Sequence, residues 1–314
     1  MRLLGCVLCT NPFIRDPSGK ILKLAKVASG EERKALALKG IPFPCGQCLA
    51  CQINKRRVWT HRMLLESYKH DASCFITLTY TDENLPNGGS LELSKRDVQL
   101  FVKRLRKRLA KELGSDLGKF RYYICGEYGP TTGRPHYHGI LFGVSAAYED
   151  IIDEEWGMGK TEIYPATTET MQYVAGYVTK KIVRPSKEDG RQKEFALMSR
   201  KPGLGALVVP ELLDLLRNNP ALAKQIELSG ELPVGLRHGQ RLLPFGRFLT
   251  EKLRDGLDLS SDVTFNRYLD ELYQKTVEFE HSGKGLVQGL LDESKVKNEQ
   301  IRKRFKIFSQ RNKI

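Results

Sequence analysis

The sequence predicts a fold of the α+β class, because three kinds of local pattern occur along it. In residues 76–81, apolar side chains alternate with threonines, which is typical of a strand. Residues 120–128 and 134–144 form two apolar runs joined by the turn sequence GPTTG, which indicates a hairpin. Residues 94–113 and 166–183 carry apolar side chains at helical spacing.

Composition limits the class of protein. The chain has 314 residues, of which 40% are apolar, as expected of a globular protein with ample core. Its formal charge of +14 favours a polyanionic partner, either nucleic acid or an acidic membrane surface. No apolar run approaches the roughly 20 residues needed to span a bilayer. The short apolar start, MRLLGCVLCT, is too brief for a secretory signal. We therefore expect a soluble, intracellular protein without membrane contact.

Three segments differ in character. Residues 1–60 are rich in cysteine and resemble loops, residues 61–205 hold most of the strand and helix patterns, and residues 206–314 are mostly helical with a basic end. We expect these segments to be a cysteine-rich N-terminal segment, a central domain and a basic helical C-terminal region.

The cysteines favour metal binding over disulfides. There are seven, an odd number in a long chain, so a disulfide framework is not expected. Cys6 and Cys9 form one C-x-x-C pair, and Cys45 and Cys48 form another. Two such pairs can hold a tetrahedral zinc ion, with Cys51 as a spare or substitute ligand. The alternative is a set of reduced thiols without a metal.

The helix expected over residues 94–113 begins at a capping serine, Ser94. Its apolar stripe consists of Val98, Phe101, Val102, Leu105 and Leu109. The other positions are strongly basic: Lys103, Arg104, Arg106, Lys107, Arg108 and Lys111. Such a run is either a solvated face or a surface that contacts phosphates.

The hairpin carries a candidate metal site. Side chains alternate faces along a strand, so His136 and His138 point the same way and Tyr137 points the other way. The turn brings Glu127 back beside them. Two imidazoles and one carboxylate leave coordination positions open, which suits catalysis. The alternative is a hairpin with two surface histidines.

The helix over residues 166–183 carries candidate nucleophiles. Tyr173, Tyr177 and Lys180 share one side, opposite an apolar stripe of Met171, Val174, Ala175, Val178 and Ile182. A phenol beside a cation can attack a phosphate that a metal holds. The alternative is an ordinary polar face with two aromatic side chains.

These motifs resemble those of the HUH endonuclease superfamily of replication initiators. More narrowly, the chain resembles the rolling-circle initiators of microviruses in the gokushovirus-like branch. FITLTYTDENLP, RPHYHG and YVAGYVTKK are similar to that superfamily's three motifs, and PCGQCLAC and SRKPGLG are similar to sequences of the branch. The resemblance covers about residues 45–205. Tyr137 stands where an aliphatic residue is usual.

The resemblance implies a central antiparallel sheet flanked by helices and a DNA nicking and joining enzyme. It implies that His136, His138 and Glu127 bind Mg²⁺ or Mn²⁺. Tyr173 or Tyr177 would attack the scissile phosphate, leaving a 5′-phosphotyrosyl link and a free 3′-OH, and the other tyrosine would later cut again so that the strand closes into a circle. Lys180 would stabilise the phosphate charge or lower a phenol pKa.

The resemblance also implies partners. Single-stranded DNA at a replication origin would be the substrate, in the cytoplasm of a bacterial host, and a host polymerase would extend the 3′-OH. The sequence has no P-loop motif, so unwinding would come from a host helicase. Two alternatives stay open: a transposase or relaxase of the same superfamily, and a non-catalytic nucleic-acid-binding protein that uses zinc and basic patches.

Overall fold

The chain is divided into two compact units. The structure, a computed structural model, describes residues 9, 11–15, 19–23, 41–183 and 191–311. One unit comprises residues 57–214 and 245–252 and is called the sheet unit below; the rest of the chain forms the other unit. That other unit comprises residues 1–56, 215–244 and 253–314.

A five-stranded sheet forms the centre of the sheet unit. Its order is β7-β4-β6-β5-β8, and every described pairing is antiparallel. This confirms the expected central antiparallel sheet. The strands are β4 (Ser73–Leu78), β5 (Arg121–Tyr128), β6 (Pro135–Phe142), β7 (Thr161–Pro165) and β8 (Phe195–Met198).

Strand β4 is buried on both faces, although its alternating sequence predicted a half-buried strand. It pairs with β6 on one side and β7 on the other. Ile76 and Leu78 face one layer of helices and are fully buried, and Thr77, on the other face, is only 9% exposed. Helices cover both faces of the sheet, so even the threonine between the apolar residues is removed from water.

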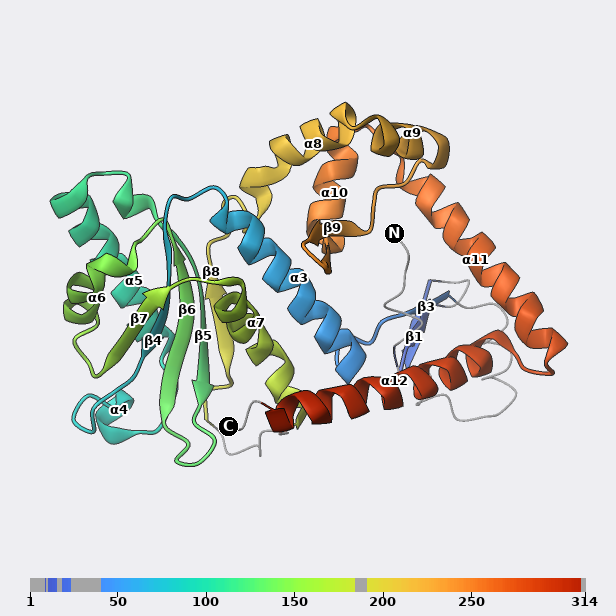
Figure 1. Ribbon diagram of the computed structural model, residues 1–314. Coiled ribbons are helices and arrows are strands. Elements are labelled where there is room, and N and C mark those ends of the chain that lie inside the picture. Colours follow the sequence, from blue (N-terminus) through green and yellow to red (C-terminus); the bar gives the residue numbers. More distant parts are fainter. Residues whose placement is uncertain (1–8, 10, 16–18, 24–40, 184–190, 312–314) are drawn as a thin grey trace. The chain divides into compact units, whose positions relative to one another are not determined.

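Helices α5 (Lys95–Leu113) and α6 (Glu149–Trp156) cover one face of the sheet (Figure 1). The predicted stripe of α5 is confirmed, since all five of its residues are buried. The Ser94 side chain accepts a hydrogen bond from the amide of Asp97, as its capping role requires. Trp156 of α6 packs on Phe101 and Tyr137, with ring centroids 5.7 Å apart in each pair.

Helices α3 (Leu49–Ser67) and α7 (Thr168–Val183) lie beyond the other face (Figure 1). Trp59 of α3 packs on Tyr123 of β5, with ring centroids 5.2 Å apart. Helix α3 begins at Leu49, inside the segment expected to resemble loops, and therefore includes Cys51.

The remaining elements confirm a mostly helical C-terminal region and add a hairpin. The helices are α8 (Val209–Asn218), α9 (Pro220–Ser229), α10 (Gly246–Gly256), α11 (Ser261–His281) and α12 (Leu286–Arg311), and the hairpin is β9 (Gly235–His238) with β10 (Arg241–Pro244). A three-stranded sheet of order β2-β1-β3 lies near the N-terminus: β1 (Phe13–Arg15), β2 (Ile21–Lys23) and β3 (Ile41–Phe43). The short helix α4 (Pro86–Gly89) follows β4. None of the helices described here combines the length and apolarity needed to cross a membrane.

A buried carboxylate joins α3 to the sheet. Glu66 has no exposed surface and forms an ion pair with Arg121 of β5. It also accepts a hydrogen bond of 2.6 Å from the amide of Gly205, and Arg121 donates to the Pro202 carbonyl at 2.6 Å. Burial would raise the pKa of Glu66, but hydrogen bonds from His70 and Gly205 and the charge of Arg121 outweigh it and hold the pKa below its ordinary value.

We expect Glu66→Gln to destabilise the protein by about 3–5 kcal/mol, because it leaves Arg121 buried without its anion. The folded-state pKa of Glu66 is depressed, so its contribution is present above the ordinary glutamate pKa of about 4.3 and is lost as the pH falls through the lower folded-state value. The free energy of unfolding, measured in urea, should therefore fall more between pH 7 and pH 3 in the wild type than in the variant.

The matched control is Glu211→Gln, which removes an ion pair with Lys69 at the surface. Its effect at pH 7 should be much smaller, since exposed pairs contribute little. Equal destabilisation by the two substitutions would contradict the role given to Glu66.

Candidate active site

The register of the β5–β6 hairpin brings the predicted metal ligands together. Glu127 lies directly opposite His136, and Cys125 lies opposite His138, so these side chains share one face of the sheet. The amide of Gly129 donates to the Arg134 carbonyl at 2.9 Å and closes the turn. Gly133 in this turn has a φ of +67°, which glycine adopts without strain.

The three ligand side chains converge. The Nε2 atom of His136 is 2.8 Å from Oε1 of Glu127, and that of His138 is 3.5 Å from the same oxygen. The three potential ligand atoms all lie within 4.8 Å of one another. Glu127 and His138 are buried, and the His136 side chain is 18% exposed. The cluster is therefore reached by solvent mainly at His136.

Hydrogen bonds on the far side of each imidazole orient both rings. The Nδ1 atom of His136 is 3.2 Å from the Arg134 carbonyl oxygen, which can only accept, so a hydrogen bond between them requires the proton on Nδ1. The Nδ1 atom of His138 is 3.0 Å from the hydroxyl of Thr77. When both Nδ1 atoms are protonated, both Nε2 lone pairs are available for a cation.

Thr77 is a candidate site residue that the sequence analysis did not identify. It lies opposite His138 in the β4–β6 pairing. The only feature of the sequence that pointed to Thr77 was its position in FITLTYT. The pairing of β4 with β6 then shows which histidine it contacts. The sheet thereby supplies both the ligand and the residue that orients it.

The donor set fits a divalent cation. Two imidazole nitrogens and a carboxylate oxygen suit Mn²⁺ or Mg²⁺, with the nitrogens favouring Mn²⁺ and leaving positions for water or a phosphate oxygen. A buried carboxylate such as Glu127 also needs compensating charge. A cation held by the three residues would supply it.

Helix α7 carries both tyrosines to the histidines. The ring of Tyr177 stacks on that of His138, with centroids 5.1 Å apart and planes within 1° of parallel. The ring of Tyr173 meets His138 edge-on at 5.3 Å and Tyr177 at 4.9 Å. The two phenols and the three predicted metal ligands therefore lie together.

The two tyrosines differ in exposure. Tyr173 is 46% exposed and Tyr177 only 6%, so the alternative of an ordinary polar face does not hold for Tyr177. Tyr177 is buried because its face of the helix rests on the sheet. Burial, followed by the charge of Glu127, raises the pKa of Tyr177; burial also raises the pKa of Tyr173. Of the predicted apolar stripe, Met171, Val174 and Ala175 are buried.

The predicted basic residues of α5 do not lie beside the candidate active site. Lys180 belongs to α7, but its side chain is outside the described residues. The basic residues of α5 lie on the opposite face of the sheet (Figure 1). There Arg108 forms ion pairs with Glu112 at 2.9 Å and Glu154 at 2.5 Å. The basic run of α5 is therefore partly neutralised and is remote from the ligands.

The cysteines form a second cluster of potential ligands. Cys9, Cys45 and Cys48 were predicted ligands, and their sulfur atoms lie within 4.8 Å of one another together with that of Cys51. Cys6, the fourth predicted ligand, is outside the described residues. The structure thus places the substitute residue Cys51 in the cluster.

Comparisons with known proteins agree with the resemblance seen in the sequence. Residues 73–182 match the family model of the replication-associated protein ORF2. The chain is 30% identical over 206 residues to the replication-associated protein VP4 of Bdellovibrio phage phiMH2K, covering 60% of this chain and 62% of that protein. It is 28% identical over 161 residues to the replication-associated protein ORF4 of Chlamydia phage 1, covering 45% and 39%.

These similarities confirm the resemblance to replication-associated proteins of phages, consistent with a microvirus-like initiator. The matched region contains the hairpin ligands and both tyrosines. The chain spans less than two thirds of the length of these relatives. No solved structure matches the chain.

We expect Thr77→Val to weaken Mn²⁺ binding by about 10–100-fold, because it removes the hydroxyl that orients His138 and keeps the side-chain shape. Calorimetric titration of the purified protein with Mn²⁺ measures this change. The control is Thr79→Val, whose hydroxyl instead bonds the Lys160 carbonyl. Equal Mn²⁺ affinity in the two variants would contradict the role assigned to Thr77.

Proposed function

We propose that this chain initiates phage DNA replication by nicking single-stranded DNA at an origin and later rejoining the strand into a circle. The observation that carries the proposal is the convergence of Glu127, His136 and His138 with Tyr173 and Tyr177. The similarity to phage replication-associated proteins supports it.

In this proposal Glu127, His136 and His138 would hold Mn²⁺ or Mg²⁺, and the bound ion would supply Lewis-acid polarisation of the scissile phosphate. Thr77 and the Arg134 carbonyl keep the imidazoles in the orientation that this requires. Lys180 follows Tyr177 by less than one helical turn, and we assign it the role of stabilising negative charge on the phosphate.

Tyr173 makes the first attack in this proposal. Nearly half of its surface is exposed, so DNA can reach it, whereas Tyr177 is buried against His138. The phenol oxygen forms a bond to phosphorus and loses its proton, the bond from phosphorus to the 3′ oxygen breaks, and that oxygen leaves as a 3′-OH. The products are a 5′-phosphotyrosyl link and a primer end.

Tyr177 is assigned the second transfer. It lies one helical turn from Tyr173 and contacts the same histidine. Its attack on the regenerated origin releases another 3′-OH, which attacks the first phosphotyrosine, restores a phosphodiester and regenerates the Tyr173 phenol. One phosphate ester is exchanged for another at each step, so no external energy source is needed.

Partners follow from these products. A host polymerase extends the 3′-OH, and a host helicase separates the strands, since the chain has no P-loop sequence. A protein that only binds nucleic acid would need neither the three ligands nor the phenols in one place. Only the proposed mechanism forms a covalent protein–DNA adduct, so detection of the adduct distinguishes it from this alternative.

We expect Tyr173→Phe to abolish most of the first adduct, and Tyr173→Phe combined with Tyr177→Phe to abolish all of it. The assay incubates the protein with single-stranded oligonucleotides covering its replicon and Mn²⁺, and denaturing gels then reveal covalent protein–DNA bands. His136→Ala should slow adduct formation by at least about a hundredfold, because metal polarisation contributes several kcal/mol to such a step.

Tyr164→Phe is the matched control, because Tyr164 is exposed on the edge strand β7. It should form adducts at the wild-type rate. Tight DNA binding without an adduct on any oligonucleotide would refute the nuclease and support the non-catalytic alternative. An adduct that is lost only with Tyr177→Phe would reverse the order assigned to the two tyrosines.

A further inference from the structure

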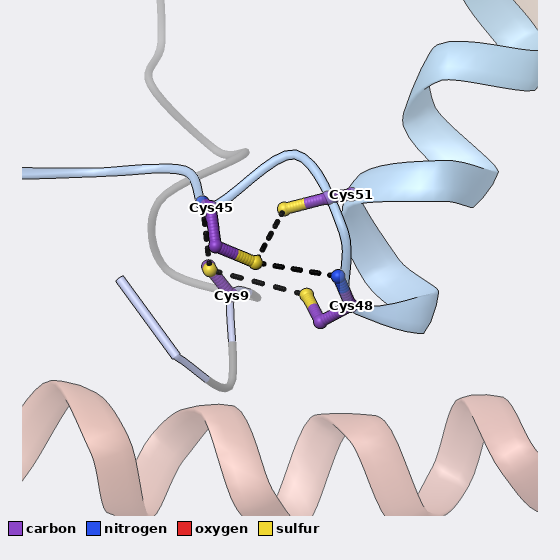
Figure 2. A group of neighbouring side chains, drawn as sticks. All are labelled: Cys9, Cys45, Cys48 and Cys51. Atoms are coloured by element: carbon purple, nitrogen blue, oxygen red, sulfur yellow. Dashed lines mark hydrogen bonds between the residues drawn. The ribbon is translucent and has the colours of Figure 1, made fainter. Parts of the chain in front are cut away.

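The cysteine cluster has the geometry of a closed tetrahedral site. The sulfur atoms of Cys45 and Cys51 are 4.0 Å apart, and those of Cys48 and Cys9 are 3.9 Å apart. Zn–S bonds of about 2.3 Å place the corners of a tetrahedron about 3.8 Å from one another. The two measured separations are opposite edges of one tetrahedron and involve all four sulfurs, which point toward a common centre (Figure 2).

These separations exclude disulfides, whose sulfur atoms are about 2.05 Å apart. None of the described cysteines forms a disulfide. Four thiols that converge without bonding covalently to one another form a set of soft donors. Sulfur in a tetrahedral set of four selects zinc or iron over hard cations such as Mg²⁺.

Backbone amides around Cys45 donate hydrogen bonds to the sulfur atoms of the cluster. The amides of Gln47 and Cys48 donate to the Cys45 sulfur at 3.4 and 3.3 Å, and the Cys45 amide donates to the Cys9 sulfur at 3.3 Å. Gly46 has a φ of +72°, which permits the tight turn between the two cysteines. Hydrogen bonds of this kind hold the sulfur atoms in the orientation that a shared metal ion requires.

The start of α3 adds to this effect. Cys48 directly precedes the helix and Cys51 lies in its first turn. The N-terminal end of a helix carries partial positive charge and favours anions. The Gln52 side chain donates to the Gly46 carbonyl at 3.0 Å and holds the turn against the helix. Two of the four donors are thereby fixed by one rigid element.

Cys9 comes from a distant part of the chain and is 1% exposed. It precedes β1, which pairs with β2 and β3 through strands of three residues each. A sheet this small has little core of its own: Ile14 is fully buried, and Phe13 stacks on Phe43 at 5.6 Å. A cross-link between Cys9 and the start of α3 would stabilise it.

We propose that Cys9, Cys45, Cys48 and Cys51 bind one zinc ion with four-sulfur coordination, and that this ion fastens the small N-terminal sheet to the start of α3. Four protein ligands leave no position for water or substrate, so the site is structural and separate from the chemistry of the hairpin ligands. The ligand set differs from two simple C-x-x-C pairs, because Cys51 completes it.

The test measures metal and thiol reactivity on the full chain, without any activity assay. Protein expressed with zinc in the medium and purified without chelator should contain one zinc per chain by mass spectrometry of the metals. Cys9→Ser and Cys51→Ser should each lose most of this zinc, and Cys6→Ser should keep it. Substitution with Co²⁺ should give the intense thiolate charge-transfer absorption of a four-sulfur site.

Thiol labelling of the wild type keeps the test independent of variants that fail to fold. Alkylation mapped by peptide mass spectrometry should leave Cys9, Cys45, Cys48 and Cys51 unmodified until a zinc chelator is added. Cys74 and Cys125, which are buried in the sheet unit, are the internal controls and should not change their labelling with chelator.

Three outcomes would overturn the proposal. Wild-type protein with much less than one zinc per chain, and with four thiols that react without chelator, has no zinc site. Protein with iron in place of zinc has a different cofactor. Loss of zinc in Cys6→Ser but not in Cys51→Ser would assign the fourth ligand to Cys6.

Discussion

The pairing of β5 with β6 sets Glu127 opposite His136 and Cys125 opposite His138, and the candidate active site depends on this register. Side chains alternate between the faces of a strand, so a slip by one residue would turn both histidines toward α5 and α6 and place Tyr137 toward α7. The turn at residues 129–134 and the buried partners of Tyr137 oppose such a slip. The ligand geometry is therefore a consequence of strand pairing as much as of ligand identity.

The side chains on the two faces of β6 contact different parts of the structure. On one face His136 and His138 meet Glu127 and the tyrosines of α7. On the other, the phenol oxygen of Tyr137 accepts from the Ser94 amide at 2.8 Å and lies 2.9 Å from the hydroxyl of Tyr80. Tyr137 thereby positions the start of α5. A polar residue is acceptable there because its hydroxyl is hydrogen-bonded.

The proposed metal sites differ in the chemistry of their donors. Nitrogen and oxygen donors in the hairpin leave coordination positions open, while four sulfurs in the cysteine cluster close the coordination sphere. Hard and soft donors prefer different ions, so the two clusters favour different metals. The two clusters lie in different units of the chain.

The sequence by itself determined the elements whose periodicity is local. The stripe of α5, the Ser94 cap, the hairpin and the common face of His136 and His138 follow from spacings of two or of three to four residues. Only the tertiary structure decided which surfaces meet. Tyr177 is buried because α7 packs on β6. Thr77 contacts His138 because β4 pairs with β6. Cys51 lies near Cys9 because the N-terminal segment lies beside the start of α3. These contacts join residues far apart in the sequence, so no local pattern encodes them.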